Sequence, residues 1–169
     1  MKVICAGMIK TGTKSMTEAL RILGFSVYDY MENLEYLGDD WLKLLEKGGG
    51  SEDFRRMYEN VDAVADVPPA HFWDEIHKAF PESKIILTMR DTEEEWIKSV
   101  DKQMKAVGIP ILFFIRFFSP TGRKMMYYSS LVANAVFGHD SKFSFFKPPS
   151  FNNFLMKMAY RRHNLHVIQ

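Results

Sequence analysis

The sequence predicts an α/β fold in three layers, with a mainly parallel sheet covered by helices. Short apolar runs of strand length alternate with helical segments through the first hundred residues, and parallel strands need such helices as crossover connections. The run Ile85-Ile86-Leu87 is apolar throughout, as expected for a strand buried on both faces of a parallel sheet. With 47% hydrophobic and 25% charged residues, we expect residues 1–169 to form a single domain.

Four strands are predicted in the first half of the chain. They cover residues 2–6, 25–30, 61–66 and 84–89. A glycine-bounded loop connects the first strand to a helix over 14–23, which has one apolar face and ends at Gly24. That face consists of Met16, Ala19, Leu20 and Leu23. The polar stretch between the second and third strands contains Gly48-Gly49-Gly50, which predicts a flexible loop.

The remaining elements are predicted to be helices. One helix begins near Pro69, since proline is tolerated in the first turn, and ends at Pro81. Thr92 and Glu95 have the spacing of a capping box for the next helix. The second half is predicted to be helical over 109–118, 124–137 and 150–167, with an aromatic linker over 143–146. The last helix is still periodic at Gln169, so we expect a chain truncated at its C-terminus.

Charge and composition exclude several classes of protein. Lys and Arg number 22 and Asp and Glu 21, which argues against binding nucleic acid or a membrane surface through bulk charge. The longest uncharged runs, 106–115 and 125–139, are shorter than the about 18 to 20 residues of a membrane-spanning helix. The single cysteine, Cys5, lies in an apolar stretch and predicts a buried thiol in a reducing compartment. We therefore expect a cytoplasmic protein, and five scattered histidines predict no zinc site.

The loop after the first strand is the main candidate for a binding site. It reads Gly7-Met-Ile-Lys-Thr-Gly-Thr-Lys-Ser15 and stands where glycine-rich loops hold phosphates with backbone N–H groups. A nucleoside-triphosphate loop follows the pattern G-x-x-x-x-G-K-[ST], and here Thr13 occupies the lysine position. If Lys14 takes that role, Ser15 becomes a magnesium ligand and the loop holds one additional residue. This alternative predicts a magnesium-dependent nucleotide kinase or NTPase.

The residues Lys10-Thr11-Gly12-Thr13 resemble the K-[ST]-G-T phosphosulfate loop of the P-loop sulfotransferases. In that family the loop holds the 5′-phosphosulfate of 3′-phosphoadenosine 5′-phosphosulfate (PAPS), and the lysine contacts the bridging oxygen during sulfuryl transfer. The resemblance implies that Lys10 is catalytic. It also implies a cofactor-binding set of Lys10, Thr11, Gly12, Thr13, Lys14 and Ser15. The proline that usually precedes the lysine is replaced by Ile9, so the stiffness that proline gives is missing.

The resemblance covers nearly the whole chain and is to the short, largely uncharacterised branch of that family. It rests on Asp66-Val-Pro-Pro-Ala-His-Phe-Trp73, Phe80-Pro81, Ile85-Ile-Leu-Thr-Met-Arg-Asp91 with Trp96 and Ser99, and Tyr160-Arg-Arg-His-Asn164. It implies a P-loop NTPase-like fold and a 3′-phosphate site made by Arg90 and Ser99. These two residues are nine apart, one more than is usual in the family. Family members continue into a further strand that has no match here.

The chemistry of sulfuryl transfer fits these residues without a metal. The reaction is an in-line displacement in which the protein supplies mainly positioning and positive charge, and a sulfuryl group carries less charge than a terminal phosphoryl group. The acceptor hydroxyl also needs a general base within hydrogen-bond reach. Asp29, Asp66 and His71 are candidates because they lie at or just past predicted strand ends. Asp66 is preferred, and a helix N-cap is its structural alternative.

The expected partner is a small-molecule acceptor that carries a hydroxyl or an amine. Aromatic residues of the second half could line an apolar acceptor pocket, although packing in the core or a lid is the alternative. They are Phe113, Phe114, Phe117, Phe118, Tyr127, Tyr128 and the aromatic residues within 143–154. An unpaired sheet edge would favour a homodimer. A non-catalytic nucleotide-binding or interaction module is the remaining alternative.

Overall fold

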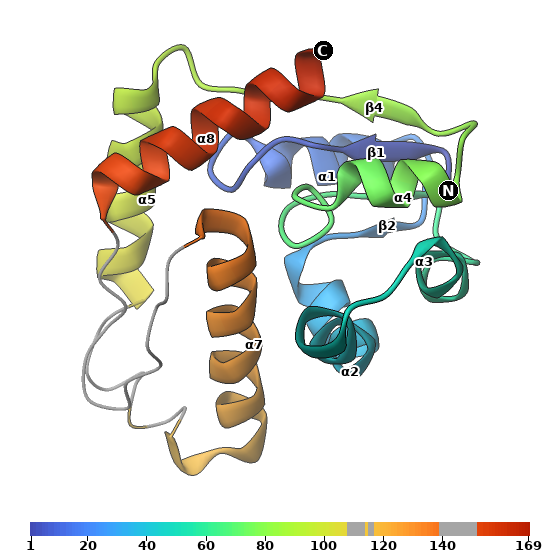
Figure 1. Ribbon diagram of the computed structural model, residues 1–169, viewed down its shortest axis with the longest axis horizontal. Helices are drawn as coiled ribbons and strands as arrows, with labels where there is room; N and C mark the ends of the chain where they lie inside the picture. The colour runs from blue at the N-terminus through green and yellow to red at the C-terminus, as the bar shows by residue number, and fades with distance from the viewer. Residues whose placement is uncertain (108–113, 115–116, 139–151) are drawn as a thin grey trace.

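The computed structural model describes residues 1–107, 114, 117–138 and 152–169. Over these residues it has an α/β fold, as predicted, with four strands and seven helices (Figure 1). The strands are β1 (Val3–Cys5), β2 (Val27–Tyr28), β3 (Ala63–Val64) and β4 (Lys84–Ile86). The helices are α1 (Thr13–Ile22), α2 (Tyr30–Lys47), α3 (Ser51–Met57), α4 (Trp73–Ala79), α5 (Glu93–Val107), α7 (Pro120–Phe137) and α8 (Asn153–Ile168).

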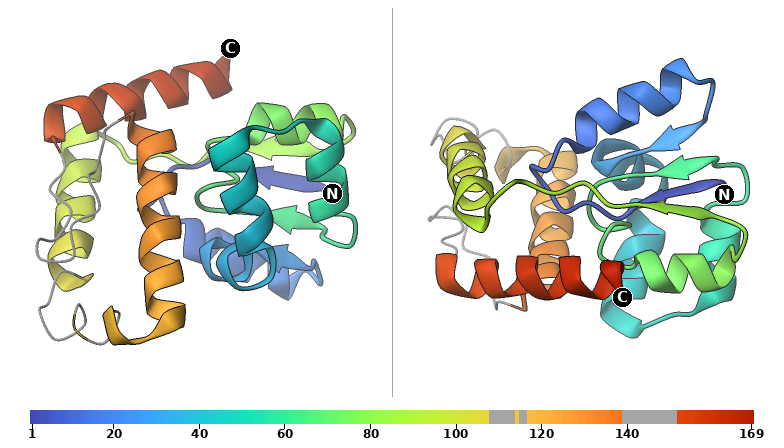
Figure 2. Two further views of the ribbon diagram at one scale, coloured as in Figure 1. Left: turned by 60° about the horizontal axis from the view of Figure 1, so that its bottom comes forward. Right: turned by 90° about the horizontal axis from the view of Figure 1, so that it is seen from above.

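The sheet is parallel throughout and has the strand order β2-β3-β1-β4. Val3 of β1 lies opposite Ala63 of β3 on one side and Lys84 of β4 on the other. Helix α1 leads from β1 to β2 over one face of the sheet, and α4 leads from β3 to β4 over the opposite face (Figure 2). The chain therefore changes direction beside β1, and ligands bind at the carboxyl edge of such a switch point in open α/β sheets.

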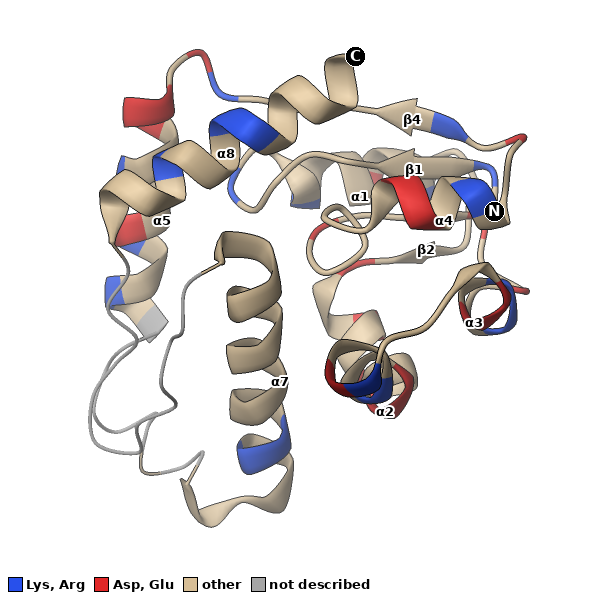
Figure 3. Cartoon of the chain, in the orientation of Figure 1, with Lys and Arg blue, Asp and Glu red and all other residues tan. Residues whose placement is uncertain are grey.

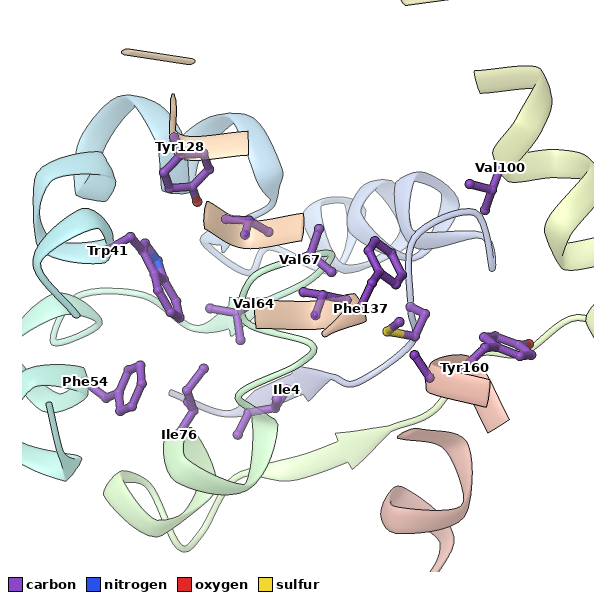
Figure 4. Close-up of a cluster of buried hydrophobic side chains, with 14 of the residues drawn as sticks. Ile4, Trp41, Phe54, Val64, Val67, Ile76, Val100, Tyr128, Phe137 and Tyr160 are labelled. Carbon is purple, nitrogen blue, oxygen red and sulfur yellow. The ribbon is translucent and has the colours of Figure 1, made fainter. Parts of the chain in front are cut away.

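Alternate residues of the central strands enter two separate cores. Ile4 of β1 and Val64 of β3 pack in the larger core together with Trp41 of α2 (Figure 4). Val3 points to the other face and packs in a smaller core with Leu20 of α1. Because side chains alternate along a strand, this arrangement buries both faces of the sheet, as the apolar strand sequences predict.

The prediction of a flexible loop between the second and third strands is wrong. Residues 30–57 form helices α2 and α3, and only the glycines from Gly48 to Gly50 separate them. Asp29 begins α2 with a capping box: its carboxylate accepts from the Met31 N–H at 2.9 Å, and Glu32 accepts from the Asp29 N–H at 3.1 Å. Gly48 ends the helix at φ 80°, a conformation that glycine adopts readily.

The sequence analysis did not predict helix α2, because two of its buried residues are not apolar. Asn33 and Gly38 are buried together with Trp41. The Asn33 amide oxygen accepts hydrogen bonds from the Trp41 indole at 3.1 Å and from the Tyr58 hydroxyl at 2.6 Å. These bonds satisfy a buried polar group, and a search for apolar periodicity does not detect them.

Other predicted elements are confirmed with shifted boundaries. Helix α1 forms, but it buries Thr13, Thr17 and Leu20, while Leu23 of the predicted apolar face is 72% exposed. Helix α7 begins before the predicted start and is capped by Ser119, whose hydroxyl accepts from the Gly122 N–H at 3.2 Å. Most of the predicted helix over 109–118 and all of the aromatic linker over 143–146 lie outside the described residues. Among the described helices, none combines the length and apolar character that crossing a membrane requires.

The helices of the second half form one side of the molecule. Helices α5 and α8 pack side by side, and α7 contacts both α2 and α8 (Figure 1). Two ion pairs join α8 to the start of α5, Lys157 with Glu94 and Arg161 with Glu93, each at 2.8 Å. Helix α5 carries charges of both signs and α8 carries only basic ones, whereas α7 has a single short basic stretch (Figure 3). The two ion pairs thus hold α5 and α8 together, while α7 packs mainly through uncharged residues.

Candidate functional site

The loop from Gly7 to Gly12 connects β1 to α1 at the carboxyl edge of the sheet. It is closed by Thr11, whose N–H and hydroxyl donate to the Met8 carbonyl at 3.3 and 2.7 Å. The Thr11 hydroxyl also shares a hydrogen bond of 2.9 Å with the Thr88 hydroxyl beyond β4. A Cβ atom at Gly7 would lie 2.0 Å from that Thr88 hydroxyl. Only glycine therefore allows the loop to approach the chain that follows β4.

The first turn of α1 offers backbone donors to a ligand. Gly12 precedes the helix at φ 101°, in the left-handed region. No side-chain cap bonds to the helix, and its first turn contains no acidic residue. Because the first N–H groups of an α-helix have no partner within the helix, those of Thr13, Lys14 and Ser15 can bind an anion, and the helix dipole favours this.

Two cations, Lys10 and Arg90, lie beside this helix end. The Lys10 ammonium is 3.2 Å from the Gln103 amide oxygen on α5. The Arg90 Nε donates to the Lys10 carbonyl at 2.9 Å, which brings the chain after β4 against the loop. Within the described residues, neither cation forms an ion pair. Both charges are thus available to an anionic ligand.

Lys14 has a different partner from Lys10. Its ammonium forms an ion pair with Asp29, whose side chain is 3% exposed. Burial opposes ionisation of Asp29, but hydrogen bonds with Glu32, Lys14 and the Met31 N–H outweigh it, and the pKa of Asp29 is lowered. Asp29 is therefore an ionised helix cap and a counter-ion for Lys14.

Asp66 lies two residues past β3 and faces the start of α1. The Thr13 hydroxyl donates to one of its carboxylate oxygens at 3.0 Å, and the Val67 N–H donates to the other at 2.8 Å. Burial raises the pKa of Asp66, and these two bonds oppose the rise only in part. The N-cap alternative for Asp66 is wrong, because Phe72 is the N-cap of α4. Asp66 is a half-buried carboxylate with increased basicity at the loop.

His71 packs against α8. Its ring lies 6.4 Å from that of His163, and its Nδ1 is buried without a partner in the described part of the chain. Burial and the neighbouring His163 lower the pKa of His71 to about 4. His163 Nε2 lies 2.6 Å from the Ala6 carbonyl oxygen, so this nitrogen carries the proton and donates. His71 is therefore a neutral packing residue between β3 and α8.

Ser99 is half-buried on α5, one turn before Gln103. Residues four apart share one face of a helix, and Gln103 contacts Lys10. The same face of α5 is thus turned toward the loop, which suits the predicted role of Ser99. Sequence reasoning missed Gln103, although its spacing from Ser99 was a usable signal.

The Cys5 thiol is buried in the smaller core, as predicted, and burial raises its pKa to about 11. In the described residues, no three His, Cys, Asp or Glu side chains are grouped as metal ligands. The arrangement at the loop is thus one of backbone amides, two cations and one basic carboxylate.

Comparison with known proteins identifies the family. The sequence matches the family described as "Sulfotransferase domain" over residues 2–169. The chain belongs to the sulfotransferase family. "Ava biosynthesis cluster protein M" of Aspergillus versicolor is 32% identical to this sulfotransferase domain over 117 residues. The match covers 63% of this chain and 44% of that relative, so the chain spans less than half of the relative's length.

The donor set fits a nucleotide that carries phosphate or sulfate groups, as PAPS does. The N-terminus of α1 and Lys10 lie together at one end of the site, and Arg90 contacts the same loop from the β4 side. No acidic residue in the first turn of α1 opposes an anion there. Two anionic groups can therefore be held by separate donors.

Proposed function

We propose that this sulfotransferase domain binds PAPS and transfers its sulfuryl group to a hydroxyl or amine of a small acceptor. The observation that carries the proposal is the combination of the uncapped α1 N-terminus with Lys10 and Arg90 around one loop. Membership of the sulfotransferase family supports it. No metal ion is needed in this scheme, since the lysine and the loop amides carry the positive charge.

The residues have separate roles in the proposal. Thr11 to Ser15 hold the 5′-phosphosulfate, and Arg90 with Ser99 holds the 3′-phosphate. Lys10 leaves Gln103 and donates to the bridging oxygen as the S–O bond breaks. The acceptor oxygen or nitrogen attacks the sulfur from the opposite side, and 3′-phosphoadenosine 5′-phosphate is released.

Asp66 is the proposed general base. Its raised pKa makes it a stronger base than an exposed carboxylate, and its hydrogen bond with Thr13 ties it to the 5′ end of the site. Asp29 is occupied by Lys14 and by the α2 cap. His71, with a pKa of about 4, is a weak base. Asp66 therefore takes the proton of the acceptor.

The test is isothermal titration calorimetry with 3′-phosphoadenosine 5′-phosphate and with ATP, each with and without magnesium. We expect the wild type to bind the bisphosphate without magnesium and to show no binding of ATP. Lys10→Ala should weaken this binding, and Lys47→Ala, which removes an exposed lysine at the end of α2, should leave it unchanged. Absence of bisphosphate binding in the folded wild type would refute the proposal.

The same titration separates the other two functions. A magnesium-dependent kinase or NTPase would bind ATP with magnesium, and Lys14 would first have to leave its buried partner Asp29. A non-catalytic module would bind the bisphosphate but show no turnover of PAPS with any acceptor. An acceptor screen with phenols, apolar alcohols and amines follows if the bisphosphate binds.

A further inference from the structure

We infer that Trp96 is a positioning residue that holds the loop of residues 7–12 in its anion-binding conformation. It acts through the Ile9 carbonyl and touches neither donor nor acceptor. The inference deepens the proposed function and rests on it for its effect on nucleotide affinity. Its effect on the loop itself is independent of that function.

The contact between Trp96 and the loop is short, and its donor is fully buried. The indole Nε1 of Trp96 donates to the Ile9 carbonyl at 2.7 Å. The Trp96 side chain on α5 is 0% exposed. Water cannot replace the Ile9 carbonyl as the acceptor, so loss of this bond would leave a buried donor unsatisfied.

Tyr160 of α8 fixes the orientation of the indole. The rings of Trp96 and Tyr160 are stacked with centroids 4.3 Å apart and an interplanar angle of 14°. The Tyr160 hydroxyl accepts from the Arg90 N–H at 3.0 Å, and Arg90 Nε in turn donates to the Lys10 carbonyl. One tyrosine thus contacts both residues that hold the successive carbonyls of Ile9 and Lys10.

The direction of these carbonyls matters to an anion. A carbonyl oxygen carries partial negative charge, and an anion is attracted to a concavity of N–H groups from which carbonyls are turned away. Side-chain donors hold three loop carbonyls, Met8 by Thr11, Ile9 by Trp96 and Lys10 by Arg90, and His163 holds the Ala6 carbonyl just before the loop. The N–H groups that begin α1 therefore remain for the ligand.

Trp96 also compensates for the residue at position 9. Proline would fix φ near −65° and stiffen the loop from within, but Ile9 leaves this torsion free. The bond from Trp96 restrains the same residue through its carbonyl, from outside the loop. The requirement for Trp96 should therefore disappear when proline is placed at position 9.

The decisive variant is Trp96→Phe, which keeps a ring for Tyr160 to stack on and removes the indole donor together with the second ring of the indole. We expect about fivefold weaker binding of 3′-phosphoadenosine 5′-phosphate, the effect of losing one hydrogen bond. Trp41→Phe is the matched control: Trp41 is also 0% exposed and donates from Nε1 to Asn33 and Tyr58, each at 3.1 Å. It should lower the melting temperature and leave the affinity unchanged.

A second measurement needs no nucleotide. Amide hydrogen exchange of Thr11 and Met16, whose N–H groups bond to Met8 and Gly12, should accelerate in Trp96→Phe and not in Trp41→Phe. If the wild type binds the bisphosphate and Trp96→Phe binds it equally well, the inference is overturned. If the wild type does not bind it, the proposed function fails, and the exchange rates alone support or overturn the role of Trp96.

A proline at position 9 provides the rescue. Ile9→Pro combined with Trp96→Phe should bind within about twofold of Ile9→Pro alone, because an internally stiffened loop no longer needs the indole. This pair also replaces the single variant if Trp96→Phe does not fold. A loss of affinity as large in the proline background as in the wild type would overturn the argument.

Discussion

Acidification should destabilise the protein through His71. The ring of His71 is packed against that of His163, and burial holds the pKa of His71 at about 4, below its ordinary value of 6.5. A lowered histidine pKa means that the folded state prefers the neutral ring. Its contribution to stability is therefore complete above pH 6.5 and is lost as the pH falls toward 4, because the unfolded chain then binds a proton that the folded chain rejects.

The size of the effect follows from the two pKa values. One pKa unit corresponds to about 1.4 kcal/mol, so the full difference amounts to about 3 kcal/mol. Between pH 7 and pH 5 the unfolded histidine becomes almost fully charged while the folded one stays mostly neutral, and about 2 kcal/mol is lost. This is a large part of the total stability of a domain of this size.

The assay is urea unfolding followed by tryptophan fluorescence at pH 7 and pH 5, in the wild type and in His71→Gln. Each protein is compared with itself at two pH values, so any cost of the substitution that does not depend on pH cancels. The wild type should lose about 2 kcal/mol more than the variant. Equal losses in the two proteins would refute the argument that His71 is buried in its neutral form.

Three further outcomes test the site. Lys10→Ala should lower the rate of sulfuryl transfer at least about 100-fold in a radiolabelled-PAPS assay, because it removes the donor to the leaving oxygen. Asp66→Asn should abolish most turnover, yet at pH 8 it should melt no lower than the wild type: the raised pKa means that the ionised Asp66 costs stability as the pH rises. Gly7→Ala should cost about 2 kcal/mol in urea unfolding because its Cβ meets Thr88 at 2.0 Å. Gly50→Ala, where a Cβ meets nothing within 4 Å, should cost less than about 1 kcal/mol.

Local sequence patterns were sufficient for the sheet and for the loop. The apolar run at Ile85 to Leu87 predicted the position of β4. The expected burial on both faces is wrong for this strand, because β4 lies at the end of the described sheet and Ile85 and Ile86 are only half-buried. Helix α2 was missed because Asn33 and Gly38 occupy buried positions that an apolar pattern does not mark. The start of α2 could nevertheless have been predicted, since Asp29 and Glu32 have the spacing of a capping box. Asp29 was interpreted as a catalytic candidate instead.

The site was predictable only where it is local in the sequence. The resemblance of the surrounding residues to the sulfotransferase motifs pointed to Lys10 and Arg90, and the structure brings both beside the start of α1. The bond from Trp96 to Ile9 joins residues far apart in the chain, and no spacing rule connects them. The neutral state of His71 likewise depends on His163 of α8, which only the tertiary fold brings to it.

The partners of the two lysines near Gly12 show which one is suited to the reaction. Lys14 is paired with the buried carboxylate of Asp29, and moving it to a ligand would leave that charge unpaired, which is costly. Lys10 donates a hydrogen bond to the neutral amide of Gln103. If an anionic oxygen of a ligand replaces that amide as the acceptor, Lys10 gains a charge-assisted hydrogen bond. The lysine before the glycine is therefore free to move to the leaving group, while the lysine after it stays with Asp29. This difference in partners favours the sulfuryl-transfer loop over the nucleoside-triphosphate loop.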